Sequence, residues 1–263
     1  MGDGVSEPIK LYWWRDLPNF GDDLAPHVVE YATGRPVEHA PCGQAELVGL
    51  GSVLAMVADM PERARPVHVW GSGYLRGTQP LVSSSQICVH ALRGELSSRR
   101  LGLRSVALGD PGLLAAAVLD VRPPVRHAVG IVGHHTHYGR PEWSRVLASN
   151  PDVLVIDARR PALPVIRDIA SCNVILSSSL HGLVVADSLG IPNRWVELSR
   201  PLCEADWKFF DYFSAVPRAV TEPEYLAAES NLERLAEDVL REDEPPDVAA
   251  VVDRLMNAFP QIS

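Results

Sequence analysis

Hydroxyl and imidazole side chains lie together in the segment Ser177-Ser-Ser-Leu-His-Gly182, which follows a predicted strand and begins a predicted helix. The first turn of a helix has unpaired N–H groups and the positive end of the helix dipole, so Ser177, Ser178 and Ser179 suit a phosphate or carboxylate ligand. Serine is also a common helix N-cap, and the serines alone fit either role. His181 is more specific, because a cap needs no imidazole and an ordinary histidine pKa of about 6.5 suits proton transfer near neutral pH.

A second polar loop, Asn19-Phe-Gly-Asp-Asp-Leu24, comes directly after the first predicted strand. Gly21 permits a tight turn that brings the start of the following helix close to a ligand. One of Asp22 and Asp23 is expected to cap that helix, which leaves the other carboxylate to hydrogen-bond a sugar hydroxyl or accept its proton. We therefore predict Asn19, Asp22 and Asp23 as site residues.

Two further loops in the first half of the chain have residue types that suit anions. Gly71, Ser72 and Gly73 follow a predicted strand with glycines spaced as a backbone cradle, although this spacing is also frequent in ordinary turns. Arg93 ends another predicted strand, where a planar guanidinium can hold a carboxylate or phosphate through two hydrogen bonds. Both loops are predicted to bind substrate.

The segment Gly133-His-His-Thr-His137 adds a histidine cluster after the first strand of the second half. Such a cluster suggests zinc, but it lacks a distant, well-spaced carboxylate or cysteine partner. We therefore predict that His134 and His135 act on substrate, and we expect neither a metal nor a cofactor.

Composition limits the class of protein. The chain has 263 residues, is 46% hydrophobic and has a formal net charge of −9. The charge and the scattered arginines argue against a nucleic-acid partner, which needs a basic stripe. Four cysteines without CxxC spacing predict reduced thiols. The apolar runs are too short to span a bilayer and the N-terminus lacks the features of a signal peptide, so we expect a cytoplasmic protein with at most peripheral membrane contact.

Short β-branched runs alternate with helical stretches, which predicts an α/β fold built on mainly parallel sheets. The stiff segment Val121-Arg-Pro-Pro-Val125 predicts a boundary between a Rossmann-like domain at 1–122 and a second one at 123–220, followed by a helical tail at 221–263. The predicted strands are 10–14, 47–50, 67–70, 86–91, 106–108, 128–132, 153–156, 174–176 and 195–198. The predicted helices are 22–32, 95–101, 142–148, 162–170 and 181–189, with helical spacing again at 248–259.

Taken in order, these loops resemble the polysaccharide pyruvyl transferase family over roughly residues 10 to 215. The pieces that carry the resemblance are Asn19–Asp22, Gly71–Gly73, Arg93–Ser97, Leu108-Gly-Asp-Pro111, Gly133–His135, Ser177–Gly182 with Ala186-Asp187, Gly190-Ile-Pro192 and Lys208-Phe-Phe-Asp-Tyr212. The resemblance implies two Rossmann-like domains facing a cleft, as in GT-B enzymes. It also implies transfer of a pyruvyl group from phosphoenolpyruvate onto two sugar hydroxyls as a ketal, in an exopolysaccharide, capsule or cell-wall glycan.

Carried onto this chain, the resemblance implies that His181 is the central catalytic or donor-binding residue and that Arg93 is an anion ligand. Some members have arginine two residues before this histidine, where this chain has Ser179. The charge of phosphoenolpyruvate must then be met by Arg93, Lys208, histidines or helix N-termini.

The chemistry needs a proton delivered to the enol carbon, protons removed from two hydroxyls, and departure of phosphate. We predict His181 as the general acid or the partner of the leaving phosphate, and Asp22 or His134 as the base on the side of the glycan acceptor, which can be lipid-linked. Four aromatic residues are candidates to stack on sugars, with core packing expected for at least half of them: Trp13, Trp14, Tyr74 and Trp143. A nucleotide-sugar glycosyltransferase and a non-catalytic glycan-binding protein are the alternatives, because a fold does not fix a function.

Overall fold

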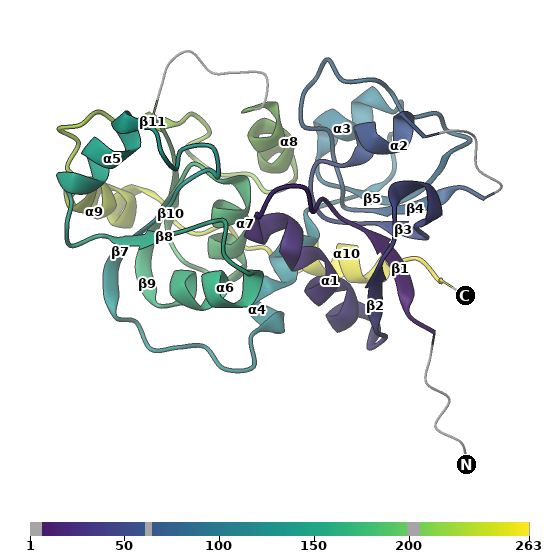
Figure 1. Cartoon of the computed structure of the whole chain (residues 1–263), viewed down its shortest axis with the longest axis horizontal. Helices are drawn as coiled ribbons and strands as arrows, with labels where there is room; N and C mark the ends of the chain where they lie inside the picture. Colours follow the sequence, from purple (N-terminus) through teal and green to yellow (C-terminus); the bar gives the residue numbers. More distant parts are fainter. Residues whose placement is uncertain (1–6, 61–64, 199–205, 263) are drawn as a thin grey trace.

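The computed structural model describes residues 7–60, 65–198 and 206–262 and forms two α/β lobes that lie side by side (Figure 1). Every strand pairing in both sheets is parallel. The first sheet has the spatial order β2 (Val37–His39), β1 (Ile9–Tyr12), β3 (Leu47–Val48), β4 (Val67–Trp70), β5 (Ile87–Leu92), β6 (Ala107–Leu108). The second has the order β11 (Glu224–Tyr225), β10 (Asn193–Glu197), β9 (Cys172–Ser177), β7 (His127–Val132), β8 (Leu154–Ile156). The predicted fold class of two Rossmann-like domains is confirmed.

Helices connect the strands and follow the second sheet. The α-helices are α1 (Phe20–Thr33), α2 (Leu54–Ala58), α3 (Glu95–Arg100), α4 (Ala115–Val118), α5 (Pro141–Ala148), α6 (Ala162–Ala170), α7 (Leu180–Ser188), α8 (Trp207–Ala215), α9 (Leu232–Glu242) and α10 (Ala249–Asn257). Two short 3₁₀ helices, η1 (Cys42–Gln44) and η2 (Pro111–Leu114), follow β2 and β6.

The predicted strand at 67–70 and the predicted helix at 162–170 have the bounds of β4 and α6, and the other predicted elements differ by one or two residues at their ends. The sequence pattern did not predict β2, α2, α4, α8 or β11. These elements are short or depend on partners distant in the chain: β2 pairs with β1, and β11 pairs with β10. The predicted helical tail therefore contains an edge strand of the second sheet as well as α9 and α10.

One hydrophobic core runs through both lobes. It joins residues of the first lobe, such as Leu24 and Trp70, to residues of the second, such as Ile166 and Val184. Helix α7 is buried on nearly all sides, which is consistent with a mostly apolar sequence that lacks an exposed polar face. This core contains residues from both sides of the predicted boundary at 122–123, and the division of the chain into domains there stays a prediction.

The tail packs on both lobes. Helix α9 supplies Leu232 and Val239 to the core on the outer face of the second sheet. Helix α10 returns to the first lobe, where the Trp70 indole N–H donates to the carbonyl of Leu255 at 2.8 Å. Helix α10 and the C-terminus lie on the side of the first lobe in Figure 1.

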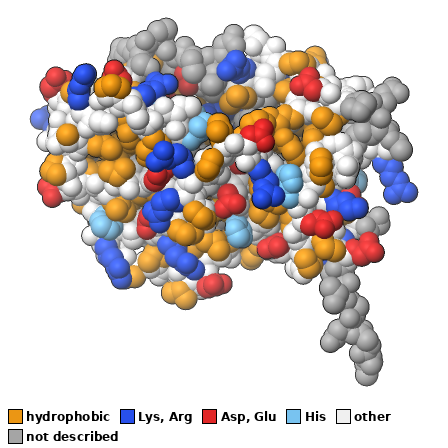
Figure 2. Space-filling model, viewed as in Figure 1, with side chains coloured by type: hydrophobic (Ala, Val, Ile, Leu, Met, Phe, Trp, Pro, Cys, Tyr) orange, Lys and Arg blue, Asp and Glu red, His pale blue; other side chains and the backbone are white. Residues whose placement is uncertain are grey.

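The surface in Figure 2 intersperses acidic and basic side chains over both lobes. The face shown therefore has no continuous basic stripe of the kind that follows a nucleic-acid backbone. Within the described ranges, none of the helices has both the length and the apolar character needed to cross a membrane.

The loops predicted to hold the site all leave the carboxyl ends of parallel strands. They follow β1, β4, β5, β7 and β9. Ligands of open parallel sheets bind at this edge, because the connecting loops and helix N-termini gather there. The parallel topology therefore places the site loops of each lobe along one edge of its sheet.

Candidate functional site

His181 lies in the first turn of α7 beside Asp110, which caps η2 of the other lobe. The Nε2 atom of His181 is 3.7 Å from Oδ2 of Asp110, and both side chains are buried. The other carboxylate oxygen of Asp110 accepts from the Gly112 N–H at 2.9 Å. Neither Nε2 nor Oδ2 has a hydrogen-bond partner among the described residues. Buried polar atoms without partners are few in folded proteins, so this pair indicates a place for a ligand or a reacting proton.

Helix α1 approaches the same imidazole closely. An ideal Cβ added to Gly21 would lie 2.0 Å from Nδ1 of His181. Only glycine fits beside the His181 ring. This close contact explains the glycine at position 21 in addition to the tight turn predicted from the sequence. The starts of α1 and α7, one from each lobe, therefore meet at His181.

Replacing Gly21 with alanine is expected to displace the His181 ring. Overpacking of this kind costs about 1–3 kcal/mol of stability, and a shift of a reacting group by about 1 Å costs roughly 100-fold in rate. Thermal unfolding and turnover measure the two effects. Gly43→Ala is the matched control, because a Cβ added at Gly43 would lie 3.4 Å from its nearest neighbour, the sulfur of the flexible Met60 side chain. Wild-type turnover in a folded Gly21→Ala protein would show that the position of His181 is not critical.

Asp22 lies in the first turn of α1, within electrostatic reach of His181. Burial raises the pKa of Asp22 above its ordinary value, while the charges of His181 and Lys208 and a hydrogen bond from Asn19 act in the opposite direction. The Asn19 amide donates to Oδ2 of Asp22 at 2.6 Å. Asn19 also caps α1, since its side-chain oxygen accepts from the Gly21 N–H. Asn19 and Asp22 are thus part of the cluster around His181.

Asp23 has a different setting from Asp22. Its Oδ2 accepts from the backbone N–H of Ala162 at 2.9 Å, at the start of α6 in the other lobe. The Phe20 N–H donates to the carbonyl of Ala158 in the same region. Asp23 therefore joins the lobes, and its predicted contact with substrate stays a prediction.

Lys208 brings a cation to the cluster from the first turn of α8. Its Nζ lies 3.4 Å from Nε2 of His134, and Nδ1 of His134 lies 2.8 Å from the Thr136 hydroxyl. Burial, followed by the charge of Lys208, lowers the pKa of His134 to about 2. Burial also lowers the pKa of Lys208. His134 is therefore a neutral acceptor for the lysine ammonium and a weak base.

The other two histidines of this loop are His135 and His137, and His137 lies near a carboxyl group. The ring centroids of His135 and His134 are 4.2 Å apart, and burial lowers the pKa of His135. The Nε2 atom of His137 is 3.8 Å from Glu197, and burial lowers the pKa of His137 to about 4. Burial raises the pKa of Glu197 to about 7, so this carboxyl group titrates near neutral pH.

The three serines mainly support their own loop. The Ser177 hydroxyl donates to the carbonyl of Ser179 at 2.7 Å and accepts from its N–H at 3.0 Å. The Ser178 hydroxyl accepts from the His134 N–H at 2.9 Å and lies 3.0 Å from Nδ1 of His137. Ser179 occupies the N-cap of α7, but its side chain makes no capping bond to the described residues. Of the three, Ser179 is best placed to offer its hydroxyl to a ligand.

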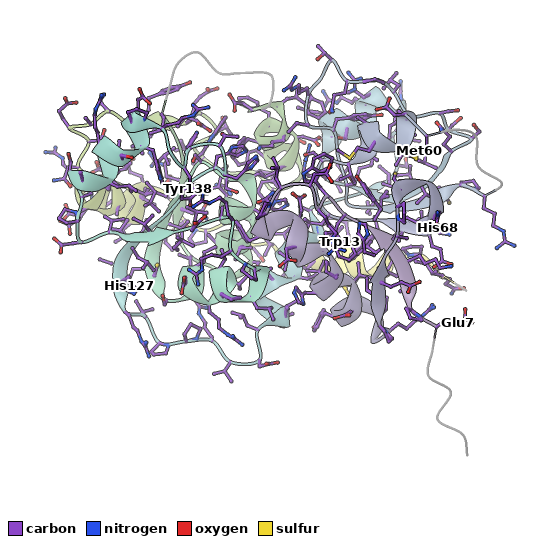
Figure 3. All side chains as sticks on the ribbon, viewed as in Figure 1. Glu7, Trp13, Met60, His68, His127 and Tyr138 are labelled. Atoms are coloured by element: carbon purple, nitrogen blue, oxygen red, sulfur yellow. The ribbon has the colours of Figure 1, made fainter. Side chains whose placement is uncertain are left out.

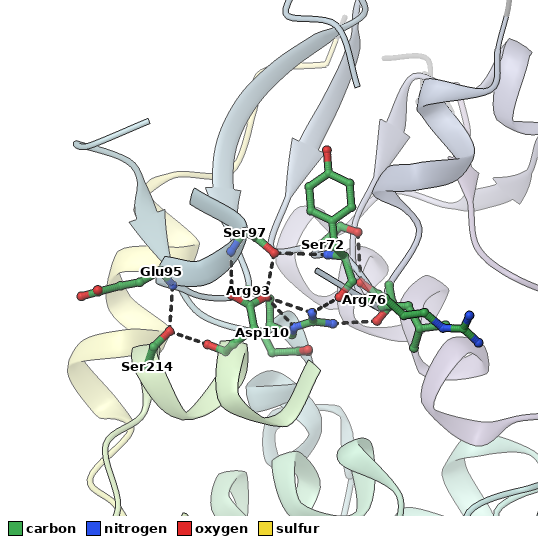
Figure 4. A network of polar contacts seen from close by, with 12 residues as sticks. Ser72, Arg76, Arg93, Glu95, Ser97, Asp110 and Ser214 are labelled. Carbon is green, nitrogen blue, oxygen red and sulfur yellow. Dashed lines mark hydrogen bonds and ion pairs between the residues drawn. The ribbon is translucent and has the colours of Figure 1, made fainter. Parts of the chain in front are cut away.

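Arg93 is fully buried and bonded within the protein (Figure 4). Its Nε donates to Oδ2 of Asp211 at 3.0 Å, Nη1 donates to the Ser52 hydroxyl at 2.7 Å, and Nη2 donates to the Tyr74 carbonyl. Asp211 also accepts from the N–H and the hydroxyl of Ser97. The guanidinium therefore ties β5 and α3 to α8, the helix that presents Lys208. A direct contact of Arg93 with an anion would require this network to open.

The Gly71-Ser-Gly73 turn is also engaged with the protein. The N–H groups of Gly71 and Gly73 donate to the carbonyls of Ala91 and Gly51, and the Ser72 hydroxyl donates to Gly51 at 3.0 Å. An ideal Cβ on Gly73 would lie 2.6 Å from Nη2 of Arg93. These contacts give the turn a packing role against Arg93, and its predicted role as an anion cradle stays a prediction.

A groove of about 200 Å³ adjoins the cluster at Asn19 and Asp23. Trp13, Trp14 and Arg159 are among the residues that line it, and Trp13 lies between the two lobes in Figure 3. Of the other aromatic candidates, Tyr74 and Trp143 are buried in hydrophobic clusters. Core packing therefore accounts for Tyr74 and Trp143, and stacking of a sugar on Trp13 or Trp14 stays a prediction.

Three functional candidates had no role assigned from the sequence: Asp110, Glu197 and the Arg93 partner Asp211. Asp110 lies in the Leu108–Pro111 segment, directly after a predicted strand, which is the signal that could have identified it. Glu197 lies at the end of β10, again a carboxyl end of a strand. Asp211 lies in the Lys208–Tyr212 segment, but its pairing with Arg93 could not be predicted locally, because the two residues are 118 positions apart.

The chain is similar in sequence to a known protein family and to individual proteins. The family model described as polysaccharide pyruvyl transferase matches residues 61–200, slightly more than half of the chain. Succinoglycan biosynthesis protein ExoV of Rhizobium meliloti (strain 1021) is 27% identical over 209 residues, which are 76% of this chain and 63% of that protein. An uncharacterized protein of Acanthamoeba polyphaga mimivirus is 34% identical over 134 residues, 48% of this chain and 47% of that protein.

The chain thus spans between about half and two thirds of the length of these relatives. Among solved structures, a functionally uncharacterized protein from Klebsiella pneumoniae subsp. pneumoniae NTUH-K2044 aligns with a TM-score of 0.44 and 11% identity, covering 78% of this chain and 87% of that one. On the strength of the family match, this chain belongs to the polysaccharide pyruvyl transferase family.

Proposed function

We propose that this chain transfers the pyruvyl unit of phosphoenolpyruvate onto two hydroxyls of a sugar in a polysaccharide precursor, forming a ketal and releasing phosphate. Membership in the family supports the class of reaction. The observation that carries the proposal is the buried pair of His181 Nε2 and Asp110 Oδ2, at the meeting of the two lobes and without partners in the described structure.

The reaction balances without a cofactor. Two C–O bonds form between the central carbon of the donor and the two sugar oxygens, and its C–O bond to phosphate breaks. Two hydroxyl protons are released: one ends on the methylene carbon, which becomes a methyl group, and the other leaves on phosphate. The site therefore needs a group that gives a proton, a group that accepts one, and a cation for the donor's negative charge.

His181 supplies the proton in this proposal, either to the methylene carbon or to the leaving phosphate. Oδ2 of Asp110, 3.7 Å from Nε2 of His181, faces the imidazole and helps to orient it. Asp22 is the base for the acceptor hydroxyl, because burial raises its pKa and a carboxylate with a raised pKa is the stronger proton acceptor. His134, with a pKa of about 2, is too weak a base and instead orients Lys208.

Lys208 is the proposed cation for the carboxylate or phosphate of the donor. Its ammonium lies beside His134 in the histidine loop of the second lobe. The ion pair of Arg93 and Asp211 attaches α8, the helix of Lys208, to the first lobe. We assign Arg93 a positioning role: it holds the helix that presents Lys208. Ser179 at the N-cap of α7 adds a hydroxyl donor beside His181.

The acceptor sugar is proposed to enter through the groove beside α1. Trp13 and Trp14 line it together with arginines, and an aromatic face is a good surface for a sugar ring. Arg159 in this groove is held by a bidentate contact to Asp157 and stacks on Tyr138 with its Cζ 4.2 Å from the ring centroid. Arginines at this entrance suit an acceptor that is itself phosphorylated, such as a lipid-linked precursor. We propose that the chain acts in the cytoplasm, where phosphoenolpyruvate is made.

The test is phosphate release from phosphoenolpyruvate with a panel of free and lipid-linked oligosaccharides. We expect acceptor-dependent release, with one pyruvyl ketal per product detected by mass spectrometry. Phosphoenolpyruvate alone should raise the melting temperature, because it binds only the folded protein. A shift with nucleotide sugars in place of phosphoenolpyruvate would indicate a glycosyltransferase. Glycan binding without phosphate release would indicate a non-catalytic relative.

A further inference from the structure

Three potential metal ligands lie together on the first sheet, outside the cluster around His181. In the register of β4 and β5, His68 pairs with Cys88. His90 is the residue skipped where the register shifts between Val89 and Ala91, and its ring lies beside that of His68. The Nδ1 atom of His68 is 2.9 Å from Nε2 of His90. The ligand atoms of all three side chains lie within 4.8 Å of one another.

These side chains have the chemistry of a transition-metal site. A transition metal binds the imidazole nitrogen and the thiolate sulfur, and the structure gathers two imidazoles and one thiol whose ligand atoms lie within reach of a single ion. Cys88 is a free and exposed cysteine, so the group opens to solvent. Two imidazoles and one thiolate suit zinc, which binds histidine and cysteine in tetrahedral sites and leaves a fourth position for water or a carboxylate.

The surroundings supply a compensating charge. The backbone N–H of His68 donates to the carbonyl of Glu46 at 2.9 Å. The Glu46 carboxylate lies within electrostatic reach of the His68 ring. A zinc ion with one thiolate keeps one positive charge, and a nearby carboxylate reduces that charge.

We propose that His68, Cys88 and His90 bind a zinc ion. The site differs from the histidine cluster at 134–137, because its ligands come from adjacent strands and include a cysteine. It is a structural site in this proposal: the metal joins β4 to β5 a few residues before they reach Gly71 and Arg93. Figure 3 shows His68 on the first lobe, whereas His127 lies on the second.

The experiment is a titration of the chelator-treated, reduced protein with Zn²⁺ by calorimetry, and with Co²⁺ by absorption spectroscopy. We expect one ion per chain, a thiolate-to-Co²⁺ charge-transfer band, and a higher melting temperature with Zn²⁺ than without. In Cys88→Ser the band should disappear and the affinity should fall roughly tenfold or more. His90→Asn should weaken binding to a similar degree.

Two variants are the controls. His127→Asn removes a partly exposed histidine on the other lobe, and Cys203→Ser removes a thiol that lies outside the described residues. Both should bind zinc as the wild type does. Absence of stoichiometric binding at micromolar Zn²⁺ would overturn the proposal. A charge-transfer band that persists in Cys88→Ser, or that is lost in Cys203→Ser, would also overturn it by placing the metal elsewhere.

Discussion

Replacing His181 with alanine is expected to reduce turnover of phosphoenolpyruvate about 1,000-fold, within the range of 10²–10⁴ that general acid–base groups contribute. Nε2 of the His181 imidazole is buried and faces Oδ2 of Asp110. Neither atom has a hydrogen-bond partner among the described residues. Removing the imidazole takes away the proposed proton donor and the side chain that faces Oδ2 of the buried Asp110. Acceptor-dependent phosphate release under saturating donor measures the loss.

Loss of folding must be separated from loss of chemistry in this variant. Circular dichroism and the melting temperature establish whether His181→Ala is folded, and His181→Asn keeps most of the side-chain volume while removing the titrating group. His127→Ala is the matched control, since it removes a partly exposed histidine at the start of β7. A loss of only a few-fold in a folded His181→Ala protein would show that this histidine does not transfer the proton.

Arg93→Ala is expected to cost about 3–5 kcal/mol of unfolding free energy, the usual result of removing one partner of a buried ion pair. For a chain of this length that loss lowers the melting temperature by roughly 10 °C. The side chains of Arg93 and Asp211 have no exposed surface. Removing the guanidinium leaves the carboxylate of Asp211 buried with only its bonds from Ser97. Denaturant and thermal unfolding measure the change.

The exposed pair of Arg99 and Glu95, one turn further along in α3, is the control. Its side chains are 73% and 45% exposed, so Arg99→Ala should change stability by less than about 0.5 kcal/mol. The double variant Arg93→Met with Asp211→Leu should recover part of the lost stability, because no buried charge is left unpaired. An Arg93→Ala protein with unchanged stability but a raised KM for phosphoenolpyruvate would instead support the direct anion contact that the family resemblance implies.

Several parts of the fold follow from local sequence. The alternation of β-branched runs and helical stretches predicted parallel α/β lobes, and β4 and α6 have the predicted bounds. Helix α7 was recognisable because a strand, a serine turn and a mostly apolar helix are contiguous in the chain. Local hydrogen bonds and burial periodicity determine such elements, and both can be read from neighbouring residues.

The site divides in a similar way. His181, Asp22, His134 and Lys208 were all named from the sequence, and the structure brings them within electrostatic or hydrogen-bond reach of one another. Asp110 completes the pair with His181 but comes from the other lobe. Its role depends on a contact between residues 71 positions apart, and no spacing rule covers that distance.

By itself the sequence determined the fold class, the loops at the carboxyl ends of the strands, and the residue types available for proton transfer. Only the tertiary structure decided which polar groups are already satisfied by the protein. Arg93 reads as an anion ligand in sequence, yet Asp211, Ser52 and Tyr74 occupy its guanidinium. His68, Cys88 and His90 show no metal motif in sequence, yet adjacent strands bring them together. The physical reason is the same in both cases: the neighbours of a polar side chain are set by packing between distant segments, which local pattern does not encode.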